Sequence, residues 1–463
     1  MEFNQSAIYK YHNNPEGLAD SFAASFYVNK DKTFPINPFG VFAELGIHFV
    51  FRNLNKLEGI LIPSDCNENS SLVAINYKRP IQRQRYTAAH ELCHIIKDVS
   101  NQTISCEIGA KTRTERFAES FASAFLIPKD ELQKKINNQL INNFLSCDDI
   151  LIIAEYFGVS FQACTYRIQN CFPKVLPENL ETLIKKYKPS KRRERFGFSN
   201  TNLYTSILNS WDEYLWQNPE NTMASFRFKN DYVYNDARLE NIETTPEAVS
   251  EIVADLRLNT QHSQYCQQQY SSFTEIAGHS KLYDYIFDYS TNNPISVFDI
   301  LKLNRILFSC AVCPDFGGRT RTSNVMVIGA KFESCDYHDI TSKLLETEKE
   351  VKSLDSNWGI MSKSEVLRQI VSIHHQLTVI HPFADGNGRT IRAFTNLQLI
   401  RYGIPPVFIY NENKKIYLNA LCKADKGDSS ELFEVFLREL FRSHADFYSM
   451  NKSQKRKTNQ SQN

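Results

Sequence analysis

No run of apolar residues in this sequence approaches the roughly 18 that a membrane-spanning helix needs, and residues 1–14 lack the apolar segment of a secretory signal. Neither sign of charge dominates, since the formal net charge is +1, so nucleic acid is not the expected main partner. The 11 cysteines are scattered, and Cys310 and Cys313 have no second Cys or His pair at zinc-finger spacing. We expect a cytoplasmic protein with reduced thiols.

The length is too great for one ordinary hydrophobic core. Since a typical domain has about 150 residues, 463 residues predict two or three domains. Between residues 173 and 200 the sequence combines three prolines with seven Lys and Arg residues between Lys185 and Arg195. Prolines and like charges disfavour a packed element, which predicts a solvated linker; a nucleic-acid patch is the alternative.

One short run near the C-terminal end, HPFADGNGRTIR at residues 381–392, concentrates residues suited to a nucleotide phosphate. Apolar residues at spacings of three and four predict one helix over 366–380 and a second with an apolar face over 391–400. The loop between them therefore opens onto a helix N-terminus. Unpaired N–H groups and the helix dipole bind anions there, and glycines allow close approach.

The side chains of this run suggest a division of roles. Asp385 can hold Mg²⁺, which prefers one or two carboxylates plus phosphate oxygens. Arg389 and Arg392 are three residues apart, so two guanidinium groups on one helix face can clamp phosphate oxygens. His381 titrates near neutrality and suits a general base.

The run resembles the signature of the Fic (Fido) family, HPFxDGNGRxxR, without departure. The resemblance implies a mainly α-helical domain that transfers AMP from ATP, with Mg²⁺, to a hydroxyl side chain of a target protein, releasing pyrophosphate. His381 would be the base and Asp385 the Mg²⁺ ligand. Arg389 and Arg392 would hold the β- and γ-phosphates, and the phosphate cradle would be Gly386, Asn387 and Gly388.

Other segments resemble further parts of this family. Residues 235–246 are similar to its inhibitory helix, which implies that Glu240 pairs with Arg392 and blocks the γ-phosphate position; Asp236 stands where Ser or Thr is usual. Residues 316–329 alternate like a hairpin and resemble the flap that holds the target segment. Tyr417 resembles a residue beside the adenine, with a buried core tyrosine as the alternative.

A second motif lies in the N-terminal part, after strand-like segments within 39–62 and a two-residue alternation over 71–77 typical of a half-buried strand. It reads HELCH, with His90 and His94 one helical turn apart, so that both can bind one Zn²⁺ beside the general base Glu91. Glu115 and Glu119 lie on one face of the next predicted helix. We expect Glu115 as the third zinc ligand and Glu119 to orient a ligand histidine.

These residues resemble the ImmA/IrrE metallopeptidase family. The resemblance implies a repressor or antitoxin-like protein as the cleaved substrate. The family usually has Gly in place of Cys93 and often Asn in place of Glu119. Residues 149–168 predict two short helices broken at 157–160. We favour packing over DNA reading for them, because Arg167 is their one basic residue.

The predicted organisation is an α+β zincin-like domain over 1–172, a linker over 173–200, a mainly α-helical Fic domain with a β-hairpin flap over 201–449, and a disordered tail over 450–463. As a hypothesis, the first domain governs release of Glu240 or removes a partner. Three alternatives stay open: transfer of another phosphate-containing group, a zinc domain that only binds, and a regulator whose Fic site binds nucleotide without transfer. The sequence does not reveal the oligomeric state.

Overall fold

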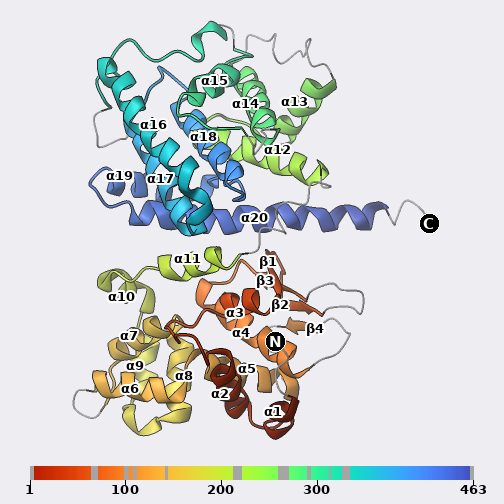
Figure 1. Cartoon of the computed structure of the whole chain (residues 1–463), viewed down its shortest axis with the longest axis vertical. Helices are drawn as coiled ribbons and strands as arrows, with labels where there is room; N and C mark the ends of the chain where they lie inside the picture. Colours follow the sequence, from red (N-terminus) through yellow and green to blue (C-terminus); the bar gives the residue numbers. More distant parts are fainter. Residues whose placement is uncertain are drawn as a thin grey trace. The chain divides into compact units, whose positions relative to one another are not determined.

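The computed structural model describes residues 5–63, 71–98, 104–107, 112–140, 144–211, 222–258, 271–288, 293–311, 314–325 and 334–458 (Figure 1). The chain divides into two compact units, Met1–Asp212 and Glu213–Asn463. We call them the first unit and the second unit. Among the described residues, no helix combines the length and apolarity needed to cross a bilayer.

The first unit contains a four-stranded sheet in the order β1-β3-β2-β4. Its strands are β1 (His48–Arg52), β2 (Leu57–Ile62), β3 (Leu72–Asn76) and β4 (Ile104–Glu107). β1 and β3 run parallel, whereas β2 is antiparallel to both β3 and β4. The strands predicted before residue 85 are present, but β3 is not half-buried: Val73 to Asn76 are all buried, because β3 is an inner strand.

Helices make up most of the rest of the first unit. They are α1 (Gln5–Lys10), α2 (Pro15–Phe26), α3 (Pro38–Glu44), α4 (Ile81–Lys97), α5 (Arg113–Leu126), α6 (Lys129–Gln139), α7 (Cys147–Phe157), α8 (Phe161–Cys171), the 3-10 helix η1 (Pro173–Val175), α9 (Leu180–Lys186), α10 (Pro189–Phe196) and α11 (Thr201–Asn209). α4 packs against β2 and β3 and also against α5, and α5 packs on α2. The histidine-bearing helix is thereby enclosed.

The fully buried side chain of Arg85 fixes α4 in place. Its guanidinium donates hydrogen bonds to the carbonyl oxygens of Ile36 (2.6 Å), Gly158 (3.1 Å) and Phe157 (3.3 Å). Burial lowers the pKa of Arg85 to about 10. Carbonyl oxygens that accept from this buried charge tie α4 to the end of α7, five residues before His90.

The predicted linker is wrong. Residues 173–200 contain η1, α9 and α10, and several of their polar side chains bind acidic residues of α7: Tyr187 donates to Asp148 Oδ1 (2.7 Å), and Arg193 pairs with Glu155. The acidic side chains of α7 attract the basic side chains of this segment, so the repulsion expected among those basic residues does not prevent packing. α11 also lies in the first unit, where Asn37 donates to Ser206 O (3.1 Å), so the predicted start of the Fic domain at residue 201 is wrong.

The described part of the second unit is helical. Its elements are α12 (Thr222–Leu239), α13 (Pro246–Leu258), α14 (Ser271–Phe287), α15 (Asp299–Leu307), η3 (Pro314–Phe316), η4 (Tyr337–Asp339), α16 (Ile340–Asn357), η5 (Trp358–Ile360), α17 (Lys363–Ile380), α18 (Asn387–Arg401), η6 (Asn411–Asn413), α19 (Lys414–Ala424) and α20 (Ser430–Thr458). α18 is packed against α14, α15 and α17. Ile391, Phe394 and Leu397 of the predicted apolar face are buried, but α18 is buried on nearly every side. Several of its polar side chains find partners on neighbouring helices.

Two predicted features of the second unit differ from the structure or lie partly outside it. The flap predicted over 316–329 shows no strand in its described part, 316–325, and the remaining residues up to 333 lie outside the described residues. The described residues on either side, Val325 and Ser334, are in contact, because Ser334 Oγ donates to Val325 O (2.9 Å). The predicted disordered tail is helical as far as Thr458, because α20 continues to that residue; 459–463 lie outside the described residues.

Candidate nucleotide site and metal centre

The loop between α17 and α18 has a defined conformation. His381 is the C-cap of α17, with φ 50°, and Gly386 is the N-cap of α18, with φ 74°; both are left-handed. A Cβ at Gly386 would also meet Phe308 Cε2 at 2.8 Å. Asn387 braces the loop by accepting from Phe383 N (2.9 Å) and donating to Phe383 O (2.8 Å). The loop is therefore held next to the first turn of α18, and N–H groups at such a helix start are suited to anions.

The Asp385 side chain is 63% exposed. Its Oδ1 accepts the Gly386 N–H at 2.6 Å and lies 3.9 Å from Arg389 Nη2. The carboxylate is thus fixed at its base while it remains accessible, which fits a cation bridged to phosphate oxygens.

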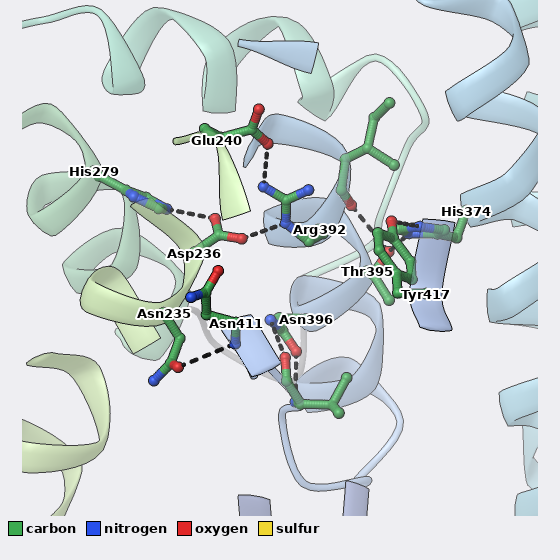
Figure 2. A network of polar contacts seen from close by, with 12 residues as sticks. Asn235, Asp236, Glu240, His279, His374, Arg392, Thr395, Asn396, Asn411 and Tyr417 are labelled. Carbon is green, nitrogen blue, oxygen red and sulfur yellow. Dashed lines mark hydrogen bonds and ion pairs between the residues drawn. The ribbon is translucent and has the colours of Figure 1, made fainter. Parts of the chain in front are cut away.

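Both arginines of the signature carry carboxylate partners that come from distant helices. Arg389 Nη1 donates to Glu275 Oε2 of α14 at 2.7 Å. Arg392 donates through Nε to Asp236 of α12 and through Nη2 to Glu240 Oε1, at 2.5 Å, just beyond the end of α12 (Figure 2). Neither arginine is free in this structure, so a phosphate that binds to them has carboxylates to displace.

Asp236 is the buried member of this group, with 1% of its surface exposed. Its Oδ2 lies 2.9 Å from His279 Nε2 of α14, so that Asp236 stands between His279 and Arg392 (Figure 2). Burial is the strongest influence on the Asp236 pKa and raises it, but Arg392 and His279 together hold that pKa below its ordinary value. Burial acts to lower the pKa of Arg392, and Asp236 and Glu240 outweigh it, so the pKa is raised. Arg392 and Asp236 therefore form a charged, buried pair.

Glu240 lies over the glycine-rich end of the loop. A Cβ added to Gly388 would lie 2.4 Å from Glu240 Oε1 and 2.9 Å from Arg392 Nη1. Only glycine leaves this space, and Glu240 fills it. The Glu240 side chain is 34% exposed, unlike that of Asp236, so it occupies the mouth of the site rather than the core.

A cavity of about 360 Å³ begins at this point, a size suited to small ligands. Its lining includes Glu240, His381, Gly388, Arg392 and Tyr417. Burial, and then the positive charge of Arg321, act to lower the pKa of His381, which ends below its ordinary value despite the opposing Thr378 backbone, Glu240 and Asp385. His381 is accordingly neutral near pH 7 and able to accept a proton.

Further residues line the cavity, Tyr417 and Asp425 among them. Tyr417 is buried, and its hydroxyl lies 2.8 Å from His374 Nε2, while His374 Nδ1 lies 2.8 Å from Thr395 Oγ1 (Figure 2). Tyr417 and His374 both line the cavity. Asp425, which sequence reasoning missed, also lines it; its side chain is 8% exposed and its Oδ2 has no hydrogen-bond partner among the described residues.

In the first unit, His90, His94 and Glu115 form a compact cluster. One potential ligand atom from each lies within 4.8 Å of the others. His90 Nε2 is 3.1 Å from both Glu115 Oε2 and His94 Nε2. Atoms that share a zinc ion at bond lengths of about 2.0–2.1 Å lie roughly 3–3.5 Å apart, so the donor set and spacing fit Zn²⁺.

Glu91 lies beside this cluster and is fully buried. Neither of its carboxylate oxygens has a hydrogen-bond partner among the described residues. Burial raises the pKa of Glu91 to about 8. Gly59 of β2 makes room for it, since a Cβ there would lie 2.5 Å from Glu91 Oε1. A buried carboxyl without a partner is a feature that a bound group would satisfy.

The residue that orients a histidine is Asp98, not Glu119. Asp98 Oδ2 lies 2.8 Å from His94 Nδ1, which leaves His94 Nε2 directed at the cluster. Glu119 is on the exposed face of α5, where its backbone carbonyl accepts from Tyr86 Oη (2.7 Å). Cys93 is buried, and burial raises the pKa of its thiol, so it behaves as a core residue.

Comparison with known families divides the chain in the same way. Residues 42–169 match the IrrE N-terminal-like domain, and residues 294–399 match the Fic/DOC family. The chain therefore carries one domain of each kind.

Among curated proteins, the protein adenylyltransferase fic-1 of Caenorhabditis elegans is 32% identical over 137 residues, which cover 30% of this chain and 25% of that protein. Protein adenylyltransferase Fic of Aedes aegypti is 47% identical over 137 residues, covering 30% and 26%. The chain thus spans about a quarter of the length of these relatives. A solved structure of Fic-1 from C. elegans aligns with a TM-score of 0.44 at 18% identity, covering 72% of this chain and 99% of that one.

Proposed function

We propose that the second unit transfers AMP from ATP to a hydroxyl side chain of a target protein. The proposal is carried by one observation: His381, Gly388 and Arg392 of the Fic-type signature line a single cavity at the N-terminus of α18. The adenylyltransferases to which residues of this chain are similar support the choice of AMP.

In the proposed reaction, His381 accepts the proton of the target hydroxyl. The hydroxyl oxygen attacks the α-phosphorus in line, the bond from that phosphorus to the bridging oxygen breaks, and pyrophosphate leaves with the electron pair. The products are AMP in phosphodiester linkage to the protein, and pyrophosphate. The N–H groups at the start of α18, with Arg389 and Arg392, would stabilise the phosphate charge. Asp385 would hold Mg²⁺, which would supply further charge neutralisation.

We propose further that Glu240 inhibits this reaction. Its carboxylate occupies Arg392 Nη2 and the space above Gly388, and a γ-phosphate would need both. A carboxylate and a phosphate compete for the same arginine by charge and by hydrogen bonding.

Labelled ATP tests which group is transferred. Purified protein carrying Glu240→Gly should incorporate label from ATP labelled at the α-phosphate, and none from ATP labelled at the γ-phosphate, because pyrophosphate departs. Labelling is measured on the protein itself and on proteins in a lysate after gel separation. Label from the γ-position alone would contradict AMP transfer and favour a kinase-like reaction.

The first unit supports a second candidate function, a zinc-dependent peptidase. The observation that favours it is the cluster of His90, His94 and Glu115 beside the unpartnered carboxyl of Glu91. Zn²⁺ bound there would polarise a peptide carbonyl and activate water. Glu91 would accept the proton of that water, because the charge of bound Zn²⁺ would favour its ionised form. A repressor or antitoxin-like protein is the proposed substrate.

Removal of the zinc ligands gives a direct test. Wild type should bind about one Zn²⁺ per chain, whereas His90→Ala should bind at least about tenfold more weakly, because one of three protein ligands is lost. Glu91→Gln should keep the zinc and lose cleavage. Zinc content after dialysis against a chelator of known affinity measures the binding. His338→Ala, at a histidine with 70% of its side chain exposed, is the matched control. Equal zinc content in His90→Ala and the control would refute the site.

A further inference from the structure

Arg321 is a buried arginine surrounded by carbonyl oxygens, with 4% of its surface exposed. Its Nε donates to His381 O at 2.8 Å, and its Nη2 donates to Ile380 O at 3.4 Å and to Cys335 O. Its backbone N–H donates to Pro382 O at 2.9 Å. One residue thus contacts the carbonyls of three consecutive residues centred on His381.

Two properties of the chain at this point explain why such a partner is needed. α17 ends at Ile380, and the last carbonyls of a helix have no partner within it; an arginine is well suited to bind them. His381 also has a positive φ of 50°, a conformation that costs energy for residues other than glycine. Hydrogen bonds that hold the carbonyls on each side keep His381 in this conformation and direct its imidazole to the cavity.

We propose that Arg321 is a positioning residue for His381, which acts by fixing the backbone on which the imidazole is carried. The inference rests on the proposed role of His381 as the base. Arg321 Nη1 also donates to Ser323 O at 2.9 Å, so the same side chain links the loop over 317–325 to the signature. A lysine could not replace it. The planar guanidinium of arginine donates in several directions at once, whereas a single ammonium group cannot reach all of these carbonyls.

Kinetics in the Glu240→Gly background test the proposal. Arg321→Gln and Arg321→Lys should each lower kcat about 100-fold, the effect expected of a displacement of about 1 Å at a reacting group, while the KM for ATP changes by less than about threefold. Arg305→Gln, at an exposed arginine of α15, should match the parent. A rise in KM as large as the fall in kcat would overturn the proposal, because Arg321 would then act on nucleotide binding.

Hydrogen exchange tests the same inference without reference to catalysis. In Arg321→Gln, the amides of His381 and Phe383, which are hydrogen-bonded to Leu377 O (3.0 Å) and Asn387 Oδ1 (2.9 Å), should exchange about tenfold faster than in the parent. Amides within 391–400 of α18 should be unchanged. Uniformly faster exchange would indicate a general structural role, and no change would show that Arg321 does not hold this loop; either result overturns the inference. If the parent transfers no AMP, the proposed function fails while this measurement still decides the role of Arg321.

Discussion

Glu240→Gly is expected to raise AMP incorporation from α-labelled ATP by about 10- to 100-fold over wild type. The substitution removes the carboxylate from Arg392 Nη2 and from the space above Gly388, whereas Asp236 still holds Arg392 Nε. A hydrogen bond to a charged group is worth about 1.5–3 kcal/mol, and competition with phosphate is relieved by about that amount. Initial rates of labelling at equal protein and ATP concentrations measure the effect.

Two companion variants make this prediction specific. Glu240→Gly with His381→Ala should lose about 10²- to 10⁴-fold of the activity that Glu240→Gly gains, the usual contribution of a general base. Glu243→Gly changes an exposed glutamate three residues away and should behave as wild type. If Glu240→Gly and Glu243→Gly label equally, Glu240 does not inhibit. If the double variant labels as well as its parent, His381 is not the base.

Asp236→Ala should destabilise the protein by about 3–5 kcal/mol, the cost of removing one partner from a buried charge pair. Arg392 and His279 would both lose the carboxylate that lies between them, in a place where water does not replace it. Glu240→Gly should cost less than about 1 kcal/mol, since Glu240 is partly exposed and Arg392 keeps Asp236.

Equilibrium unfolding in denaturant, followed by far-UV circular dichroism, measures both variants against wild type. The two carboxylates contact the same guanidinium and differ chiefly in burial. Equal destabilisation by the two substitutions would contradict the assignment of Asp236 as the structural partner of Arg392 and Glu240 as the exchangeable one.

The sequence predicts the parts of these sites that lie close together along the chain. The loop from His381 to Arg392 follows from its own glycines and the helices beside it. His90 and His94 follow from helical spacing, and Glu115 from the next helix. In each case local periodicity decides the geometry.

Partners supplied by distant helices could not be predicted in this way. Glu275 and His279 give no local signal that they meet Arg389 and Asp236, because only the packing of α14 on α18 and α12 brings them together. Asp98 was missed for a different reason. It lies four residues after His94, but just beyond the end of α4, where the helix-face argument no longer holds.

The basic segment after α8 shows how composition can mislead. Its lysines and arginines would repel one another only if no negative charge lay nearby. Asp148 and Glu155 of α7 supply that negative charge. A run of basic residues that indicates a solvated segment in the sequence can therefore belong to a packed helix when an acidic surface lies against it.

The contacts of α14 have a mechanical consequence for the nucleotide site. Glu275 and His279 are four residues apart on one face of α14. Glu275 contacts Arg389 of α18 directly, whereas His279 reaches Arg392 through Asp236 of α12. A small sliding or tilting of α14 would move the partner of Arg389 and the support of Asp236 together. A change at α14 would therefore alter the carboxylate partners of both signature arginines at once.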